Sequence, residues 1–180
     1  MEWLSDVAAW AWERHHNEWS WYIRPLFLLP YCWFAWRRSL SGIALTLLAL
    51  LTSMFWFPAP ETPSPWAVDV LAAEKAYLLG PWNWWKVALA LLVPASLGAL
   101  AVAFWRRSFL WGVAVVNFMA IAKVAWTFVF FSQAAALYHL LPAVLGAVIC
   151  NAVLAAAWWR SRARGTAARQ RESPLGPPKV

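Results

Sequence analysis

Long apolar stretches, separated by short polar connections, dominate the pattern of this chain. A helix rises about 1.5 Å per residue, so roughly 20 apolar residues cross a hydrocarbon core of about 30 Å. Five stretches reach or approach that length, and we expect each to be a transmembrane helix. The predicted spans are residues 19–36, 40–57, 84–105, 109–131 and 140–159. They predict an all-α integral membrane protein with a five-helix bundle over residues 19–159.

Two further helices are expected outside the spans. Residues 1–18 form an amphipathic pattern, in which acidic and amide side chains share one arc and tryptophan, leucine and valine fill the opposite side. Such a helix would lie flat on the outer leaflet. The outer loop 58–83 begins proline-rich and then predicts a short helix near residues 66–79, with Pro65 in its first turn and Gly80 as its stop.

The basic residues predict the orientation of the bundle, because cytoplasmic loops carry the excess of lysine and arginine. The connections and tail on one side hold ten bases and one acid, whereas the other side holds three bases and seven acids. We therefore expect the N-terminus outside and the C-terminus in the cytoplasm. Residues 160–180 are expected to form a basic, disordered cytoplasmic tail.

Composition supports the membrane class. The chain of 180 residues is 63% hydrophobic and 13% charged and contains 17 tryptophans, whereas a soluble domain is nearer half apolar and a quarter charged. Abundant arginine and alanine indicate a bacterial source, and thus the inner (plasma) membrane. The net charge is +7, but the bases flank apolar spans, so we expect contact with membrane lipids and none with nucleic acid.

Two cations inside predicted spans carry the site hypothesis. Arg24 lies near the outer end of the first span, and Lys123 lies about eight residues, or about 12 Å, inside the fourth. No predicted span contains an acid to pair with Lys123, so this lysine snorkels, loses its proton, meets backbone carbonyls, reaches an acid of the outer segments or binds an anion. With Tyr22 and His139 on the same outer side, these residues form the predicted ligand-binding site.

Two asparagines lie at equal depth in the last two predicted spans. Asn117 and Asn151 are each about eight residues from the cytoplasmic end, so we expect a structural pair between helices. The first, third and fifth spans also end in similar words: Trp36-Arg-Arg-Ser, Trp105-Arg-Arg-Ser and Trp159-Arg-Ser. Convergence on the same membrane-end chemistry explains these words, and a duplicated hairpin is the alternative.

No pattern of metal ligands, catalytic residues or cofactor-binding glycines is found in the sequence. His15 and His16 are neighbours, which point about 100° apart on a helix, and we expect them to be interfacial side chains without a metal. Cys32 and Cys150 are expected to be buried and free of metal. We therefore expect neither a cofactor nor an enzymatic activity.

The resulting hypothesis is a small tryptophan-rich membrane protein that binds a lipid or amphiphilic anion at an outward-facing cationic, aromatic site. One alternative is a structural accessory subunit, with another membrane protein as its partner. A small transporter is the second alternative, which the lack of intramembrane carboxylates weakens.

Overall fold

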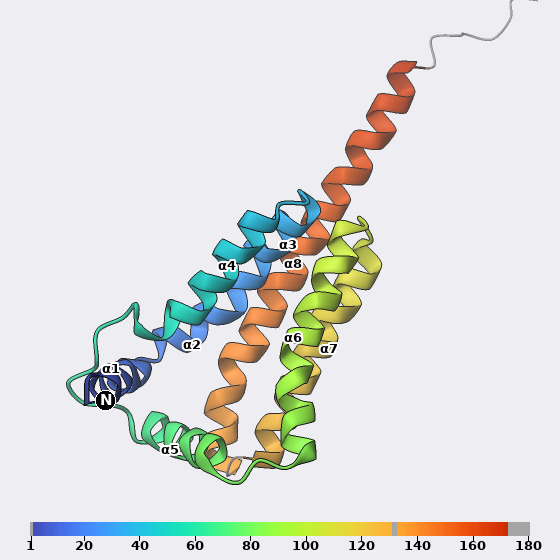
Figure 1. Ribbon diagram of the computed structural model, residues 1–180. Coiled ribbons are helices and arrows are strands. Elements are labelled where there is room, and N and C mark those ends of the chain that lie inside the picture. The colour runs from blue at the N-terminus through green and yellow to red at the C-terminus, as the bar shows by residue number, and fades with distance from the viewer. Residues whose placement is uncertain (1, 131–132, 173–180) are drawn as a thin grey trace, which may run out of the picture.

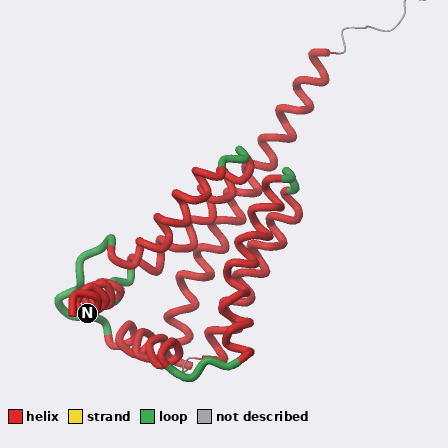
Figure 2. Tube along the Cα trace, viewed as in Figure 1, coloured by secondary structure: helices red, strands yellow, loops and turns green. Residues whose placement is uncertain are grey.

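The computed structural model describes residues 2–130 and 133–172, and the regular elements within these ranges are all helical. Figures 1 and 2 show a bundle of long helices with shorter helices at one end. The elements are α1 (Glu2–His15), α2 (Trp19–Ile23), the 3-10 helix η1 (Arg24–Phe27), α3 (Leu28–Trp36), α4 (Leu40–Thr52), the 3-10 turn η2 (Ser53–Phe55), α5 (Pro65–Leu79), α6 (Trp84–Trp105), α7 (Phe109–Phe130) and α8 (Gln133–Glu172).

Helix α8 organises the bundle. It packs against α7, α3, α5 and η1, and its C-terminal part continues past the ends of the other helices (Figure 1). The main core is formed by eight buried residues of α3, α6, α7 and α8: Tyr31, Cys32, Ala35, Leu100, Phe104, Val116, Cys150 and Leu154. Helices α1 and α5 lie at the opposite end of the bundle from the C-terminal part of α8 (Figure 1).

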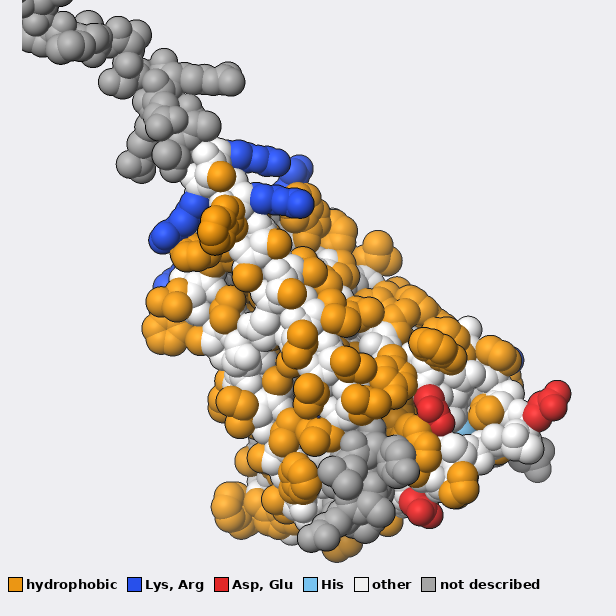
Figure 3. Space-filling view, turned by 180° about the vertical axis from the view of Figure 1, so that it is seen from behind, with side chains coloured by type: hydrophobic (Ala, Val, Ile, Leu, Met, Phe, Trp, Pro, Cys, Tyr) orange, Lys and Arg blue, Asp and Glu red, His pale blue; other side chains and the backbone are white. Residues whose placement is uncertain are grey.

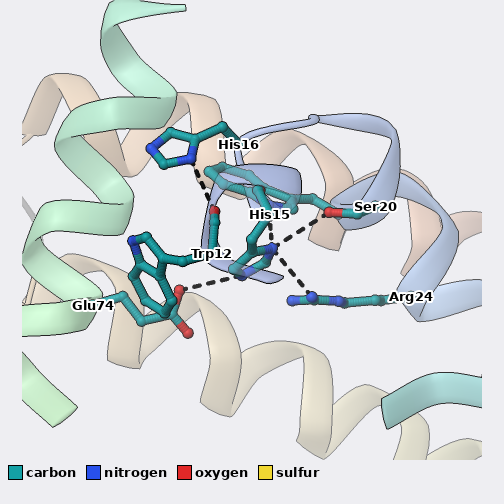
Figure 4. A network of polar contacts seen from close by, with 7 residues as sticks. Trp12, His15, His16, Ser20, Arg24 and Glu74 are labelled. Atoms are coloured by element: carbon teal, nitrogen blue, oxygen red, sulfur yellow. Dashed lines mark hydrogen bonds and ion pairs between the residues drawn. The ribbon is translucent and has the colours of Figure 1, made fainter. Parts of the chain in front are cut away.

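The first predicted span is interrupted. The chain passes from α2 through η1 into α3, with Pro25 at the start of the 3-10 segment. Proline has no N–H to donate and its ring crowds the preceding turn, which disfavours an unbroken α-helix. The interruption places Arg24 between α2 and η1, and its side chain points toward His15 of α1 (Figure 4).

Two helical hairpins, α3–α4 and α6–α7, share one turn geometry. In each turn the second arginine has a positive φ, 56° at Arg38 and 58° at Arg107. The following serine N–H donates to a carbonyl five residues earlier, at 2.9 Å in both turns. This is the hydrogen-bond pattern of a Schellman motif, here closed by arginine rather than glycine. The repeated sequence Trp-Arg-Arg-Ser therefore forms the same tight turn in both hairpins.

Helix α5 rests on a second, smaller core formed by Trp21, Ala67, Val70 and Leu71. The helix begins at Pro65, as the sequence predicts, but the Ser64 hydroxyl donates to Glu18 Oε1 at 2.7 Å instead of capping it. At its other end the buried Lys86 ammonium donates to the carbonyls of Tyr77 and Gly80. A cation at these carbonyls complements the negative end of the helix.

The structure differs from the sequence prediction beyond residue 160. Instead of a disordered segment, the chain continues α8 as helix to Glu172. The extension is rich in alanine and arginine, both strong helix formers, and it continues a helix that is already nucleated by packing. Residues 173–180 lie outside the described residues.

Three helical segments within the described ranges are long and apolar enough to cross a membrane: Trp84–Trp105, Phe109–Phe130 and Leu140–Arg164. The predicted third span coincides with α6, and the fourth ends one residue beyond α7. The segment Leu40–Phe55 is apolar but shorter. It consists of α4 and η2 and ends two residues before the predicted end at residue 57. These findings fit a membrane protein.

Charges separate toward the two ends of the molecule. Figure 3 shows lysine and arginine side chains near the C-terminal end of the bundle and acidic side chains at the opposite end, with a mainly hydrophobic surface between them. Large apolar side chains of several helices are exposed, among them Leu45, Leu91, Leu110, Ile121 and Val148.

Candidate functional site

His15 occupies the centre of a polar cluster at the end of the bundle that α1 and α5 cover. Its imidazole is buried, with 3% of the residue exposed, and lies between Glu74 and Arg24 (Figure 4). Nδ1 faces Trp21 Nε1 at 3.4 Å and Arg24 Nη2 at 3.3 Å. Indole and guanidinium groups only donate hydrogen bonds. Nδ1 is therefore the unprotonated acceptor, and the proton of the neutral ring lies on Nε2.

Glu74 lies beside the other ring nitrogen of His15. Its Oε2 lies 3.7 Å from His15 Nε2, and its side chain keeps about a third of its surface exposed (34%). Burial alone raises the pKa of the Glu74 carboxyl, but the contact with His15 Nε2, together with the charges of Lys123 and Arg24, lowers that pKa below its usual value. Glu74 is thus held as a carboxylate.

Arg24 enters the cluster from the start of η1. One guanidinium nitrogen faces His15 Nδ1, and the charge interacts with Glu74. The guanidinium has five N–H donors. Within the described part of the chain this is its one hydrogen bond, so most of its donors remain available.

Lys123 approaches from α7. Its ammonium lies 4.5 Å from the centre of the Trp126 ring, and its charge is attracted by Glu74 and repelled by Arg24. No hydrogen-bond acceptor for the ammonium is present among the described residues. The Thr127 hydroxyl, one turn away, donates instead to the Lys123 backbone carbonyl at 2.8 Å.

The four groups line one cavity of about 580 Å³. Its walls come mainly from α5, α6, α7, α8 and η1, and most of the remaining lining is aliphatic or aromatic. The volume is in the range of pockets that bind small organic ligands. The cavity therefore has an apolar body and a charged region formed by two cations, one carboxylate and a neutral histidine.

The structure brings together two of the four residues predicted for the ligand site. Arg24 and Lys123 line the cavity, whereas Tyr22 is absent from its described lining and instead packs its ring against Trp19, with centroids 6.2 Å apart. The side chain of His139 lies outside the part of the chain that the structure describes. The aromatic lining comes from Trp21, Tyr77, Trp82, Phe118 and Trp126.

Sequence reasoning missed the roles of His15 and Glu74. It placed His15 at the interface, whereas the residue is buried at the centre of the cluster, and it expected an unspecified outer acid near Lys123. A signal for Glu74 was present, because it follows Ala67, Val70 and Leu71 at helical spacing on the buried stripe of α5. No comparable signal marks His15. The sequence does not distinguish it from its neighbour His16, whose ring contacts only the carbonyls of Trp12 and Glu13.

The two asparagines predicted to pair lie side by side between α7 and α8. Asn117 Nδ2 donates to Asn151 Oδ1 at 2.9 Å, and Asn151 Nδ2 donates to Asn117 Oδ1 at 3.2 Å. Each amide also donates to the carbonyl four residues earlier in its own helix, at 2.8 Å in both cases. The pair joins the two helices and leaves no donor over.

Within the described residues, no group of three or more histidine, cysteine or acidic side chains is placed to hold a metal ion. Cys32 and Cys150 are both buried and not bonded to each other. The thiol of Cys150 donates to the Pro25 carbonyl at 3.4 Å, which ties α8 to η1 beside the cavity.

Comparison with known proteins identifies no relative: no protein-family model matches the chain, and neither the curated proteins nor the solved structures contain a match. The function is therefore inferred from the geometry of the cavity.

Proposed function

We propose that this protein is a multi-pass membrane protein that binds an amphiphilic anion in the cavity of Arg24, Lys123, His15 and Glu74. The observation that carries the proposal is the surplus of positive charge at one region of an otherwise apolar cavity. Cations in low-dielectric surroundings require anionic partners. Here the Glu74 carboxylate is the one acidic group near both Arg24 and Lys123 among the described residues that line the cavity. The apolar walls favour a hydrocarbon chain attached to the anion.

The proposal includes five spans with the N-terminus outside and the C-terminus in the cytoplasm. Besides the three long apolar helices, the first span is the broken helix α2–η1–α3 and the second is α4 with η2. The charge separation of Figure 3 supports this orientation, because bases gather at the end where both Arg-Arg turns and the C-terminal part of α8 lie. The charged region of the cavity then faces the outer side.

Ligand-dependent stabilisation tests the binding proposal. Purified protein in a nonionic detergent is titrated with phosphatidylglycerol or, separately, with phosphatidylcholine, and thermal unfolding is followed at each concentration. We expect the anionic lipid to raise Tm with a mass-action dependence. The response should be lost in Lys123→Met and partly kept in Lys123→Arg, which retains the charge with another geometry.

Lys75→Met is the matched control, because Lys75 is exposed on α5 and does not line the cavity. It should respond to lipid as the wild type does. An identical response in wild type and Lys123→Met would reject the binding site and favour a structural accessory subunit.

Cysteine-accessibility labelling tests the topology. Cysteines introduced at residue 62 should react from outside, and those at residues 40 and 165 only after the membrane is opened. Labelling of residue 165 from outside would overturn the proposed orientation.

A further inference from the structure

The charges of the cavity restrict the class of anion that it accepts. Arg24 and Lys123 each contribute one positive charge, and Glu74 contributes one negative charge. His15 contributes none, because its Nδ1 accepts from donors that cannot reverse their role. The cluster therefore carries one net positive charge.

A singly charged anion neutralises this cluster, whereas a doubly charged one leaves an uncompensated negative charge in apolar surroundings. Such a charge is costly, because a low dielectric strengthens repulsion from the nearby Glu74 carboxylate. Among the described residues that line the cavity, no lysine or arginine besides Arg24 and Lys123 is present to offset it. The nearby buried Lys86 is already bound to two carbonyls at the end of α5.

The arrangement of donors also favours a small, flat head group. Most guanidinium N–H groups of Arg24 and the ammonium of Lys123 are without acceptors among the described residues, and both side chains border the same cavity. A carboxylate accepts in a bidentate manner from arginine and has lone pairs left for a lysine. The cavity volume of about 580 Å³ is suited to a ligand with a single hydrocarbon chain.

Resting on the proposed function, we propose that the ligand is a single-chain monoanionic amphiphile of the fatty-acid class, whose carboxylate lies between Arg24 and Lys123 and whose chain lies along the aliphatic walls. Glu74 then acts as the group that sets the charge preference, because it cancels one of the two cations. The site discriminates by charge number rather than by a specific head-group shape.

Four amphiphiles with the same twelve-carbon chain test this assignment: dodecanoate, dodecyl phosphate, dodecanol and dodecyltrimethylammonium. Their dissociation constants are measured at pH 7.5 in a nonionic detergent, where the phosphate carries close to two charges. For the wild type we expect dodecanoate to bind about tenfold more tightly than dodecyl phosphate, and both more tightly than the neutral or cationic compound. A phosphate that binds as well as the carboxylate would overturn the inference.

Charge variants give a second measurement on the same compounds. Glu74→Gln raises the net charge of the cluster by one, so the preference should reverse toward dodecyl phosphate. Lys123→Met lowers the charge by one, so dodecanoate should lose its advantage over dodecanol. Lys75→Met should leave the order of the four compounds unchanged. A carboxylate-to-phosphate ratio that is the same in Glu74→Gln and wild type would remove the assigned role of Glu74.

Failure of the inference and of the proposed function give different results. If both anions bind equally and lose affinity in Lys123→Met, the anion site stands and only the charge preference is wrong. If dodecanol binds as tightly as the anions in the wild type, or the ammonium compound binds best, the anion site itself is rejected.

Discussion

Two polar clusters interrupt the apolar interior of this protein, and they differ in whether their groups satisfy one another. Asn117 and Asn151 exchange two hydrogen bonds and use their remaining donors on their own helices. The cavity cluster holds Arg24 and Lys123 against one carboxylate, with donors left over. A matched pair indicates architecture, because no N–H donor remains for a ligand. A mismatched cluster indicates a site, because its surplus charge is tolerated only if a partner offsets it.

The largest expected effect is a gain of stability on removal of the surplus charge. Lys123→Met should stabilise the ligand-free protein by up to about 2.5–3.5 kcal/mol, which is the cost of a charged side chain at the helix centre on insertion scales. Unfolding in detergent without added lipid measures it, with Lys75→Met as a control that should change stability by less than about 0.5 kcal/mol. A loss of stability in Lys123→Met would mean that the lysine holds the fold, as the asparagines do.

At Gly146, helix α8 approaches Pro25 of η1 closely. A Cβ added there would lie 2.2 Å from the Pro25 Cβ, and the proline ring cannot rotate away. Gly146→Ala should therefore cost about 1–3 kcal/mol through overpacking and weaken lipid stabilisation, because it separates α8 from η1.

Gly98→Ala is the matched control for this substitution, since nothing lies within 4 Å of its added Cβ. It should be neutral or stabilise α6 by up to about 1 kcal/mol. Equal effects of the two substitutions would show that α8 and η1 do not meet at Gly146.

Substitutions in the asparagine pair should lower stability, because each side chain is the hydrogen-bond partner of the other. Asn117→Leu or Asn151→Leu alone should each cost about 1 kcal/mol, because the remaining amide loses its partner in apolar surroundings. The double variant should cost less than the sum of the single variants. Thermal unfolding of all four proteins measures the coupling. Strict additivity would contradict the contact, and a changed lipid response would contradict its purely structural role.

The smallest effect expected is a dependence of stability on acid pH. Because the folded state lowers the pKa of Glu74, its carboxylate stabilises the protein above the usual glutamate pKa of about 4.3. That contribution is lost as pH falls through the lower folded pKa. The stability difference between wild type and Glu74→Gln, followed from pH 6 to pH 3, should shrink as pH falls. A difference that grows with acidity would mean that the folded state raises the pKa instead.

The sequence by itself determined most of the helices, because hydrophobic length, helix caps and turn sequences are local properties. Residues 84–105 were predicted as a span and form α6 with the same bounds. The equal depth of Asn117 and Asn151 also followed from counting residues along two antiparallel helices. Only the tertiary structure decided which other polar groups join Arg24 and Lys123 in the cavity. His15 and Glu74 are 59 positions apart in the chain, and their meeting depends on how the segments between α1 and α5 place these two helices. Such contacts depend on the angles at which helices cross, and a single sequence does not encode these angles in any local pattern.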